Sequence, residues 1–225
     1  MGINRQFRIA RLWSNRELRK LSPLFTGDIV NVSAWDDRDK EGGHYKDYFT
    51  QATHYYYTNT AGVRGYQNQP DEFILDLTTD LPSELHRRFE VVLNHTTLEH
   101  IFEITRAFAN LCAMTKDIAI IVVPFSQVQH ETESYGDYWR LTPSCIRRML
   151  RENGLETVYE AESHHRNAAI YLLLVGSRNP QKWRSRMPKY EPIKEAGHWI
   201  GARRSIRGLV RKLFRRHGSD PLRIE

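Results

Sequence analysis

The chain has 225 residues, of which 40% are apolar, and its formal net charge at pH 7 is +6. This length suits one domain with extensions. No apolar run approaches the roughly 20 residues of a membrane-spanning helix, and the N-terminus shows no signal peptide. We therefore expect a cytoplasmic protein whose two cysteines, Cys112 and Cys145, are reduced thiols.

Short apolar runs separated by loops fill the first half of the chain. Their length, and the β-branched and aromatic residues in them, indicate strands rather than helices. The predicted strands are residues 28–33, 55–58, 73–75 and 91–93. Helices are expected over residues 44–52 and 98–113, the second because its apolar residues recur at largely helical spacing.

The second half contains a continuous apolar run over residues 118–123, which is typical of a strand buried on both faces. Residues 143–153 form the clearest predicted helix, with Thr142 as its N-cap, Pro143 in its first turn and Gly154 just after its end. Two strands follow at residues 155–161 and 169–175, expected to form an antiparallel hairpin. Residues 183–195 contain two prolines and are expected to be an extended linker.

Alternating strands and helices predict an α/β, Rossmann-like fold. We expect a seven-stranded mixed sheet, parallel except for the C-terminal antiparallel hairpin, with helices on both faces. The expected organisation is a basic N-terminal extension over residues 1–20, a domain over residues 21–180, and a linker with a basic amphipathic segment over residues 181–225.

Charge is distributed unevenly along the chain. Residues 1–20 carry a net charge of +5 and residues 203–216 a net charge of +7, which leaves −6 for the rest. Apolar residues at helical spacing between the C-terminal basic residues are typical of a helix that lies on an anionic membrane surface. A helix exposed to solvent or bound to a partner is the alternative. The basic residues of this segment are Arg203, Arg204, Arg207, Arg211, Lys212, Arg215 and Arg216.

The segment 89–100 reads Phe-Glu-Val-Val-Leu-Asn-His-Thr-Thr-Leu-Glu-His. An apolar run stops abruptly on polar residues, as a buried strand does where its carboxyl end opens into a cleft. Ligands of open α/β sheets bind at such carboxyl ends. Two further segments are informative: Asp76-Leu77 after the third predicted strand, and residues 122–143, which contain Val-Val-Pro-Phe, then His130, then Asp-Tyr-Trp-Arg-Leu-Thr-Pro.

Together these segments resemble class I S-adenosylmethionine (SAM)-dependent methyltransferases of the type 11 kind, over about residues 25–178. The subgroup that the chain looks most like is found with polysaccharide and O-antigen synthesis genes. The resemblance implies that SAM lies across the carboxyl ends of the first four strands. The cofactor contacts that it implies are Asn31, Val32, Ser33, Ala34, Asn59, Asp76, Leu77, Asn94 and His95.

The chain departs from this family at two positions of the cofactor site. Residues 29–40 contain no glycine, although the family's first motif is glycine-rich because its backbone passes close to the cofactor. Ser33 and Ala34 are small, but Trp35 is bulky enough to fill ligand space. Asn59 stands where the family has a ribose-binding carboxylate, and an amide accepts hydrogen bonds without charge assistance.

Two histidines are candidates for a role beside the reacting methyl group. His95 ends the fourth predicted strand, and His130 lies in the loop after the fifth. Histidine is the usual general base near neutral pH, so His130 could accept a proton from a hydroxyl acceptor. A structural role in the loop is the alternative.

The segment before the 143–153 helix mixes aromatic and charged side chains. It could contact a sugar substrate, or it could close the cleft through an Asp–Arg pair and buried rings. The candidate substrate contacts are Asp137, Tyr138, Trp139 and Arg140.

The resemblance implies SAM-dependent methyl transfer to an oxygen of a glycan or glycan precursor. The basic ends of the chain could dock this cytoplasmic protein on the inner face of a membrane. Two alternatives remain open. One is a non-catalytic methyltransferase-like module in a membrane-associated assembly, and the other is an RNA methyltransferase. Nucleic acid is the less favoured partner, because the acidic middle of the chain offers no continuous basic groove. We expect no metal site.

Overall fold

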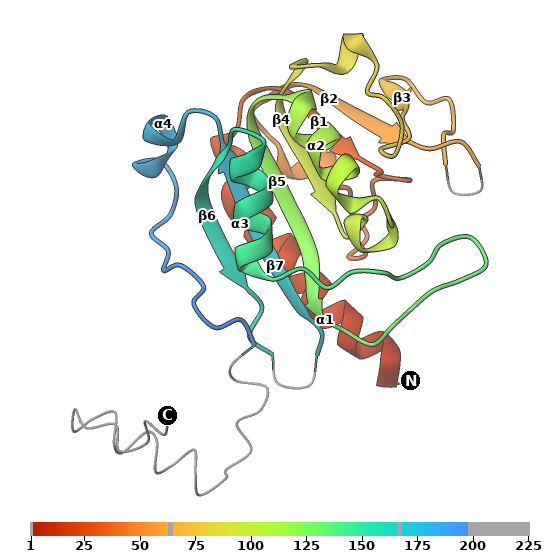
Figure 1. Ribbon diagram of the computed structural model, residues 1–225, viewed down its shortest axis with the longest axis vertical. Coiled ribbons are helices and arrows are strands. Elements are labelled where there is room, and N and C mark those ends of the chain that lie inside the picture. The colour runs from red at the N-terminus through yellow and green to blue at the C-terminus, as the bar shows by residue number, and fades with distance from the viewer. Residues whose placement is uncertain (1, 63–64, 166–167, 198–225) are drawn as a thin grey trace, which may run out of the picture.

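The computed structural model describes residues 2–62, 65–165 and 168–197. Its centre is a seven-stranded sheet of order β3-β2-β1-β4-β5-β7-β6 (Figure 1). The strands are β1 Gly27–Val32, β2 Ala52–Asn59, β3 Glu72–Ile74, β4 Phe89–His95, β5 Thr115–Ser126, β6 Glu156–Glu162 and β7 Ile170–Ser177. Neighbours among β1 to β5 are parallel, and β7 runs antiparallel to both β5 and β6. The predicted mixed, Rossmann-like sheet is confirmed.

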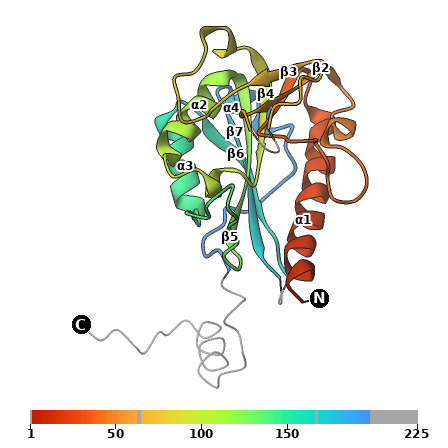
Figure 2. The ribbon, with the colours of Figure 1, turned by 90° about the vertical axis from the view of Figure 1, so that its right-hand side faces the viewer.

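Helices cover both faces of the sheet, as expected. The α-helices are α1 Gly2–Leu21, α2 Ile104–Met114, α3 Pro143–Glu152 and α4 Pro180–Arg184. Short 3-10 helices are η1 Ser22–Leu24, η2 Tyr45–Tyr48, η3 Ser83–Leu85 and η4 Leu98–His100. Figure 2 shows α1 on one face and α2 with α3 on the other. None of the helices in the described ranges is long and apolar enough to cross a membrane.

The central strands β1 and β4 end side by side. Val32 of β1 pairs with Asn94 of β4, and Asn31 pairs with Leu93. Both strands are buried, with Val30, Val92 and their neighbours in the core between the sheet and α2. The loops that begin at residues 33 and 96 therefore emerge next to each other, at the edge of the sheet where ligands of this architecture bind.

The N-terminal segment differs from its prediction as a basic extension. Residues 2–21 form α1, which packs against the sheet near β7 (Figure 2). Ala10, Leu18 and Leu21 are fully buried in this contact, while Arg16, Arg19 and Lys20 face outward. The helix is thus part of the domain, because it buries an apolar stripe against the sheet while Arg8, Arg16, Arg19 and Lys20 lie on its outer face.

The connection between β1 and β2 contains no α-helix in the described structure. We expected a helix over residues 44–52, but only η2 forms, and β2 already begins at Ala52. The expected helix over residues 98–113 is likewise split into η4 and α2. The clearest prediction holds: the Thr142 hydroxyl accepts a hydrogen bond from the amide of Cys145 at 3.2 Å, and Gly154 has a φ of +74° at the end of α3.

The C-terminal segment also differs from an extended linker. Trp183 in α4 is buried and its indole donates to Asp117 at 2.8 Å. Farther on, the amide of Ile193 donates to Glu160 at 3.1 Å, which holds this segment on β6. The domain therefore continues beyond residue 180.

If α1 belongs to the core, Leu18→Ala should lower the free energy of unfolding by about 2–5 kcal/mol, because it leaves a cavity between helix and sheet. Arg16→Ala is the matched control, since Arg16 is exposed on the same helix and should change stability by less than about 0.5 kcal/mol. Urea unfolding followed by circular dichroism measures both. Equal stability of the two variants would contradict the packing of α1.

Candidate functional site

A polar cavity of about 310 Å³ lies at the carboxyl ends of β1 and β4. We call it the β1–β4 cavity. It contains five of the residues predicted for the site, namely Asn31, Ser33, Ala34, His95 and His130. The charged lining residues were not predicted: Arg11 comes from α1, Glu99 from η4, and Asp36, Arg38 and Lys40 from the loop after β1.

The loop after β1 adopts the left-handed backbone that glycines usually provide, but with other residues. Ser33, Trp35, Asp37 and Lys40 have φ values of 59°, 51°, 58° and 65°. Such conformations cost free energy for residues with a Cβ atom and persist where surrounding contacts enforce them. The lack of glycine therefore did not abolish the tight loop.

The carboxylate of Asp37 supplies the contacts that hold this loop. One of its oxygens accepts from Asn31 Nδ2 at 2.7 Å and from the Tyr55 hydroxyl at 3.0 Å. The other accepts from the amide of Lys46 at 2.9 Å. Burial raises the pKa of Asp37, while these hydrogen bonds oppose that rise. The side chain is 2% exposed and joins β1, β2 and η2 at one point.

Asn59 is not free to bind a ribose. Its Oδ1 accepts from the amide of Trp35 at 2.7 Å, and its Nδ2 donates to the Trp35 carbonyl at 3.1 Å and to Glu72 at 2.6 Å. The amide thus fastens the loop after β1 to the ends of β2 and β3. Replacement of the usual acid by asparagine suits this role, because an amide can both donate and accept.

The other predicted cofactor contacts lie outside the β1–β4 cavity. Asp76 is exposed and closes a local turn, accepting from the amide and hydroxyl of Thr78 at 2.8 and 2.7 Å. Leu77 is buried in the core, as is Val32. Asn94 is fully buried and donates to the Val32 carbonyl at 3.0 Å, which ties β4 to β1.

Both ring nitrogens of His95 are engaged by side chains of α1. Arg11 Nη1 lies 2.9 Å from His95 Nδ1, and Ser14 Oγ lies 2.8 Å from His95 Nε2. Because a guanidinium only donates, Nδ1 must be the acceptor and Nε2 must carry the proton. Burial and the adjacent Arg11 charge lower the pKa of His95. The neutral ring fixes Arg11 at the cavity.

Arg11 is a half-buried cation whose hydrogen-bonding partners are neutral. Besides His95, it donates to the Thr96 hydroxyl at 2.9 Å and to the Tyr45 hydroxyl at 3.4 Å. A guanidinium prefers a carboxylate or phosphate partner. Because the Arg11 guanidinium lies on the cavity wall, it can bind an anionic group of a ligand.

Glu99 faces this positive charge from η4. It is 2% exposed, and its Oε2 is buried without a hydrogen-bonding partner among the described residues. Burial raises the pKa of Glu99 to about 8, against the influence of Arg11 and Arg140. An unsatisfied buried carboxyl on a cavity wall fits a ligand that donates a hydrogen bond or carries positive charge.

His130 lies at the mouth of the cavity with His100 and Tyr135. The His100 ring centroid is 4.9 Å from that of His130 and 4.7 Å from that of Tyr135. The His100 Nδ1 is 2.6 Å from the Gly136 carbonyl, so that nitrogen donates. The structure thus keeps His130 in reach of a ligand, as its prediction as a catalytic residue requires.

The predicted substrate contacts form a closing segment beside the cavity. Both oxygens of the buried Asp137 side chain bind Arg140 at 2.6 Å, and Asp137 also accepts from the amide of His130 at 2.8 Å. Trp139 donates to the Ile101 carbonyl at 3.0 Å. Tyr138 is 52% exposed but does not line the cavity. Their contacts match the structural alternative, an Asp–Arg pair with packed rings.

The basic residues between 203 and 216 lie outside the described residues. Their predicted binding to an anionic membrane stays a prediction from sequence.

No protein-family model and no curated protein matches this sequence. Solved structures match it in fold. Magnesium protoporphyrin IX methyltransferase from Synechocystis, with bound S-adenosylhomocysteine, has a TM-score of 0.55 at 12% identity, covering 79% of this chain and 88% of that chain. The 1,6-didemethyltoxoflavin-N1-methyltransferase of Burkholderia thailandensis has a TM-score of 0.53 at 14% identity, covering 74% and 80%.

A SAM-dependent methyltransferase from Mesorhizobium loti is similar to the same extent, with a TM-score of 0.53 at 12% identity, covering 75% of this chain and 98% of that chain. The protein therefore has the fold of SAM-dependent methyltransferases.

The donor set of the cavity fits the amino-acid end of SAM. Arg11 suits the carboxylate of that end, and the unpartnered oxygen of Glu99 can accept a hydrogen bond from its ammonium group. On the adenosine side, Asn59 and Asp76 are engaged in contacts within the protein. The residues that best match a part of SAM therefore lie on the side of the cavity formed by α1 and η4.

The buried carboxyl predicts a pH dependence of stability. Because the folded state keeps the Glu99 proton up to about pH 8, and the unfolded chain releases it near the usual pKa of 4.5, unfolding releases a proton between these values. The free energy of unfolding contributed by this group therefore falls as pH rises through that window, by at most about 1.4 kcal/mol per pH unit.

Glu99→Gln keeps the shape and removes this titration. Urea unfolding at roughly pH 5 and pH 8 should show that the variant gains stability relative to the unmodified protein as pH rises. A stability difference that is the same at both pH values would contradict the burial of a titrating Glu99.

Proposed function

We propose that the protein is a SAM-dependent methyltransferase that binds the cofactor in the β1–β4 cavity. The fold supports this proposal, and the single observation that carries it is the pair of Arg11 and Glu99 on one cavity wall. When bound there, SAM would supply a methyl group on a positively charged sulfur. Arg11 would hold the carboxylate, with its guanidinium fixed by His95 and Thr96.

The acceptor that we propose is a hydroxyl of a glycan or glycan precursor. The resemblance noted from sequence supports this class, and so does the polar character of the cavity. His130 would accept the hydroxyl proton, since it lines the cavity on the side of the closing segment. Methyl transfer also depends on holding the two reactants in line, which a cavity with fixed walls favours.

One observation favours a different function. Asn59 and Trp35 are bonded to each other where the family places a ribose contact. A non-catalytic methyltransferase-like module is the second candidate on this ground.

Cofactor binding is tested by isothermal titration with SAM and S-adenosylhomocysteine. We expect Arg11→Ala to weaken binding of both by about ten- to a hundredfold, because a charge-assisted hydrogen bond contributes about 1.5–3 kcal/mol. Arg8→Ala is the matched control, as Arg8 is an exposed arginine on the same helix. Absence of binding at millimolar ligand, or equal loss in both variants, would contradict the proposed site.

Transfer itself is tested with SAM carrying a tritiated methyl group and a mixed panel of oligosaccharides. Label should appear in the glycan fraction, and His130→Ala should reduce the rate by about a hundredfold or more while leaving SAM affinity unchanged. Label in added RNA instead would favour the RNA methyltransferase. Intact SAM binding without transfer to either acceptor would favour the non-catalytic module.

A further inference from the structure

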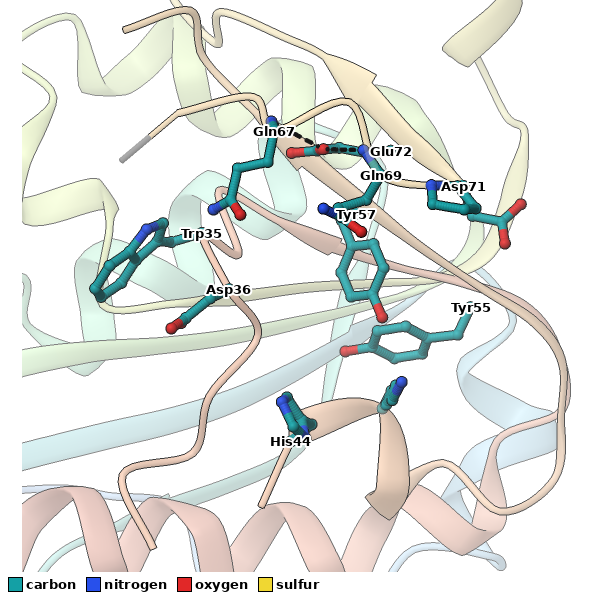
Figure 3. Close-up of a pocket in the computed structure, with 11 residues that line it drawn as sticks. Trp35, Asp36, His44, Tyr55, Tyr57, Gln67, Gln69, Asp71 and Glu72 are labelled. Carbon is teal, nitrogen blue, oxygen red and sulfur yellow. Dashed lines mark hydrogen bonds between the residues drawn. The ribbon is translucent and has the colours of Figure 1, made fainter. Parts of the chain in front are cut away.

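A second cavity, of about 470 Å³, lies beside the first, between the loop after β1 and the β2–β3 connection (Figure 3). We call it the outer cavity. Trp35 and Asp36 line both cavities and so form the wall between them. The connection between β1 and β2, which contains no α-helix in the described residues, lines the outer cavity with Trp35, Asp36, His44 and Lys46.

Two aromatic side chains define its interior. Figure 3 shows Trp35 and Tyr57 on opposite sides, with the side chain of Gln67 directed into the space between them. Trp35 is 37% exposed, which is unusual for so large an apolar side chain. Tyr57 is half-buried and keeps part of its ring accessible. Such ring faces provide apolar contact area at little cost in side-chain entropy.

The hydrogen-bonding groups that line the cavity are both neutral and charged, the charged ones being Asp36, Lys46, Asp71 and Glu72. The Tyr57 hydroxyl makes no hydrogen bond to the residues that the structure describes, and burial raises its pKa to about 12, so it stays protonated and can both donate and accept. Gln67 and Gln69 contribute exposed amides, which also donate and accept.

Two of the three lining carboxylates, Glu72 and Asp36, are already engaged. Glu72 accepts from the amides of Gln67 and Gln69 at 3.0 and 2.9 Å (Figure 3). It also accepts from Asn59 Nδ2 at 2.6 Å. Asp36 pairs with Arg38 at 3.2 Å. Glu72 therefore holds the β2–β3 connection in place, and the cavity is shaped before any ligand arrives.

We propose that the outer cavity is a carbohydrate-binding subsite. Sugar C–H groups would pack on the Trp35 and Tyr57 rings, while sugar hydroxyls would bond to the Tyr57 hydroxyl and the Gln67 amide. A polyol matches the ring faces and the neutral donors and acceptors among these groups. The inference rests on the proposed glycan acceptor, and it places one sugar unit of that acceptor next to the β1–β4 cavity, across Trp35.

Saturation-transfer NMR tests this without any cofactor. The probes are the methyl glycosides of glucose, galactose, mannose, rhamnose and N-acetylglucosamine, at millimolar concentration. At least one should receive saturation at its ring C–H protons. Tyr57→Phe and Gln67→Ala should each weaken its affinity roughly three- to tenfold, as expected for one lost hydrogen bond, and Tyr57→Ala should abolish the signal.

Phe102→Ala is the control, because Phe102 is 63% exposed and does not line this cavity. It should bind like the unmodified protein. Gln67 is exposed, so loss of binding in Gln67→Ala is not explained by unfolding.

Three results would each overturn the proposal. None of the five glycosides receives saturation, or Tyr57→Ala and Gln67→Ala bind with unchanged affinity, or adenosine displaces the glycoside while a second glycoside does not. SAM titration is independent, so failure here and failure of the cofactor site are distinguishable.

Discussion

The buried carboxylate of Asp37 is the constraint on which the arrangement of both cavities depends. It binds Asn31 of β1, Tyr55 of β2 and the first turn of η2 together. The loop after β1 must then fold tightly between these points, with non-glycine residues in the left-handed region. As a consequence, Trp35 lies at the boundary between the two cavities, and its backbone amide donates a hydrogen bond to Asn59.

A second constraint comes from α1. This helix lies on the sheet and delivers Arg11 to the end of β4, where neutral partners hold its charge. Glu99 lines the same cavity and is buried with one oxygen unpartnered within the described structure. Each group alone would be costly to bury. Together they form a site for a ligand that carries both a negative and a positive group, which is the chemistry of the amino-acid end of SAM.

Much of the fold was predictable because its signals are local. The apolar runs of β4 and β5 and the signals around α3, Thr142 and Gly154, depend only on neighbouring residues. The role of α1 was missed because its basic residues dominate the composition and conceal the buried stripe of Ala10, Leu18 and Leu21.

The site was less predictable because its contacts join distant parts of the chain. Arg11 and His95 are 84 residues apart in sequence, and nothing near either residue indicates the other. The left-handed backbone conformation of Trp35 cannot be inferred from composition. Contacts with Asp37 and Asn59 impose this conformation, and tryptophan does not prefer it. Glu99 could have been found, because an acid in the short helix that follows a buried strand end in a cleft is a candidate for a raised pKa.

The central claim is that a glycine-free loop still leaves a cofactor cavity with Arg11 on its wall. A crystal structure of the protein with S-adenosylhomocysteine tests it most directly. The account predicts the amino-acid carboxylate on Arg11, the ammonium group beside Glu99, and Trp35 still bonded to Asn59. An empty β1–β4 cavity at saturating ligand, or the amino acid bound away from Arg11, would contradict it.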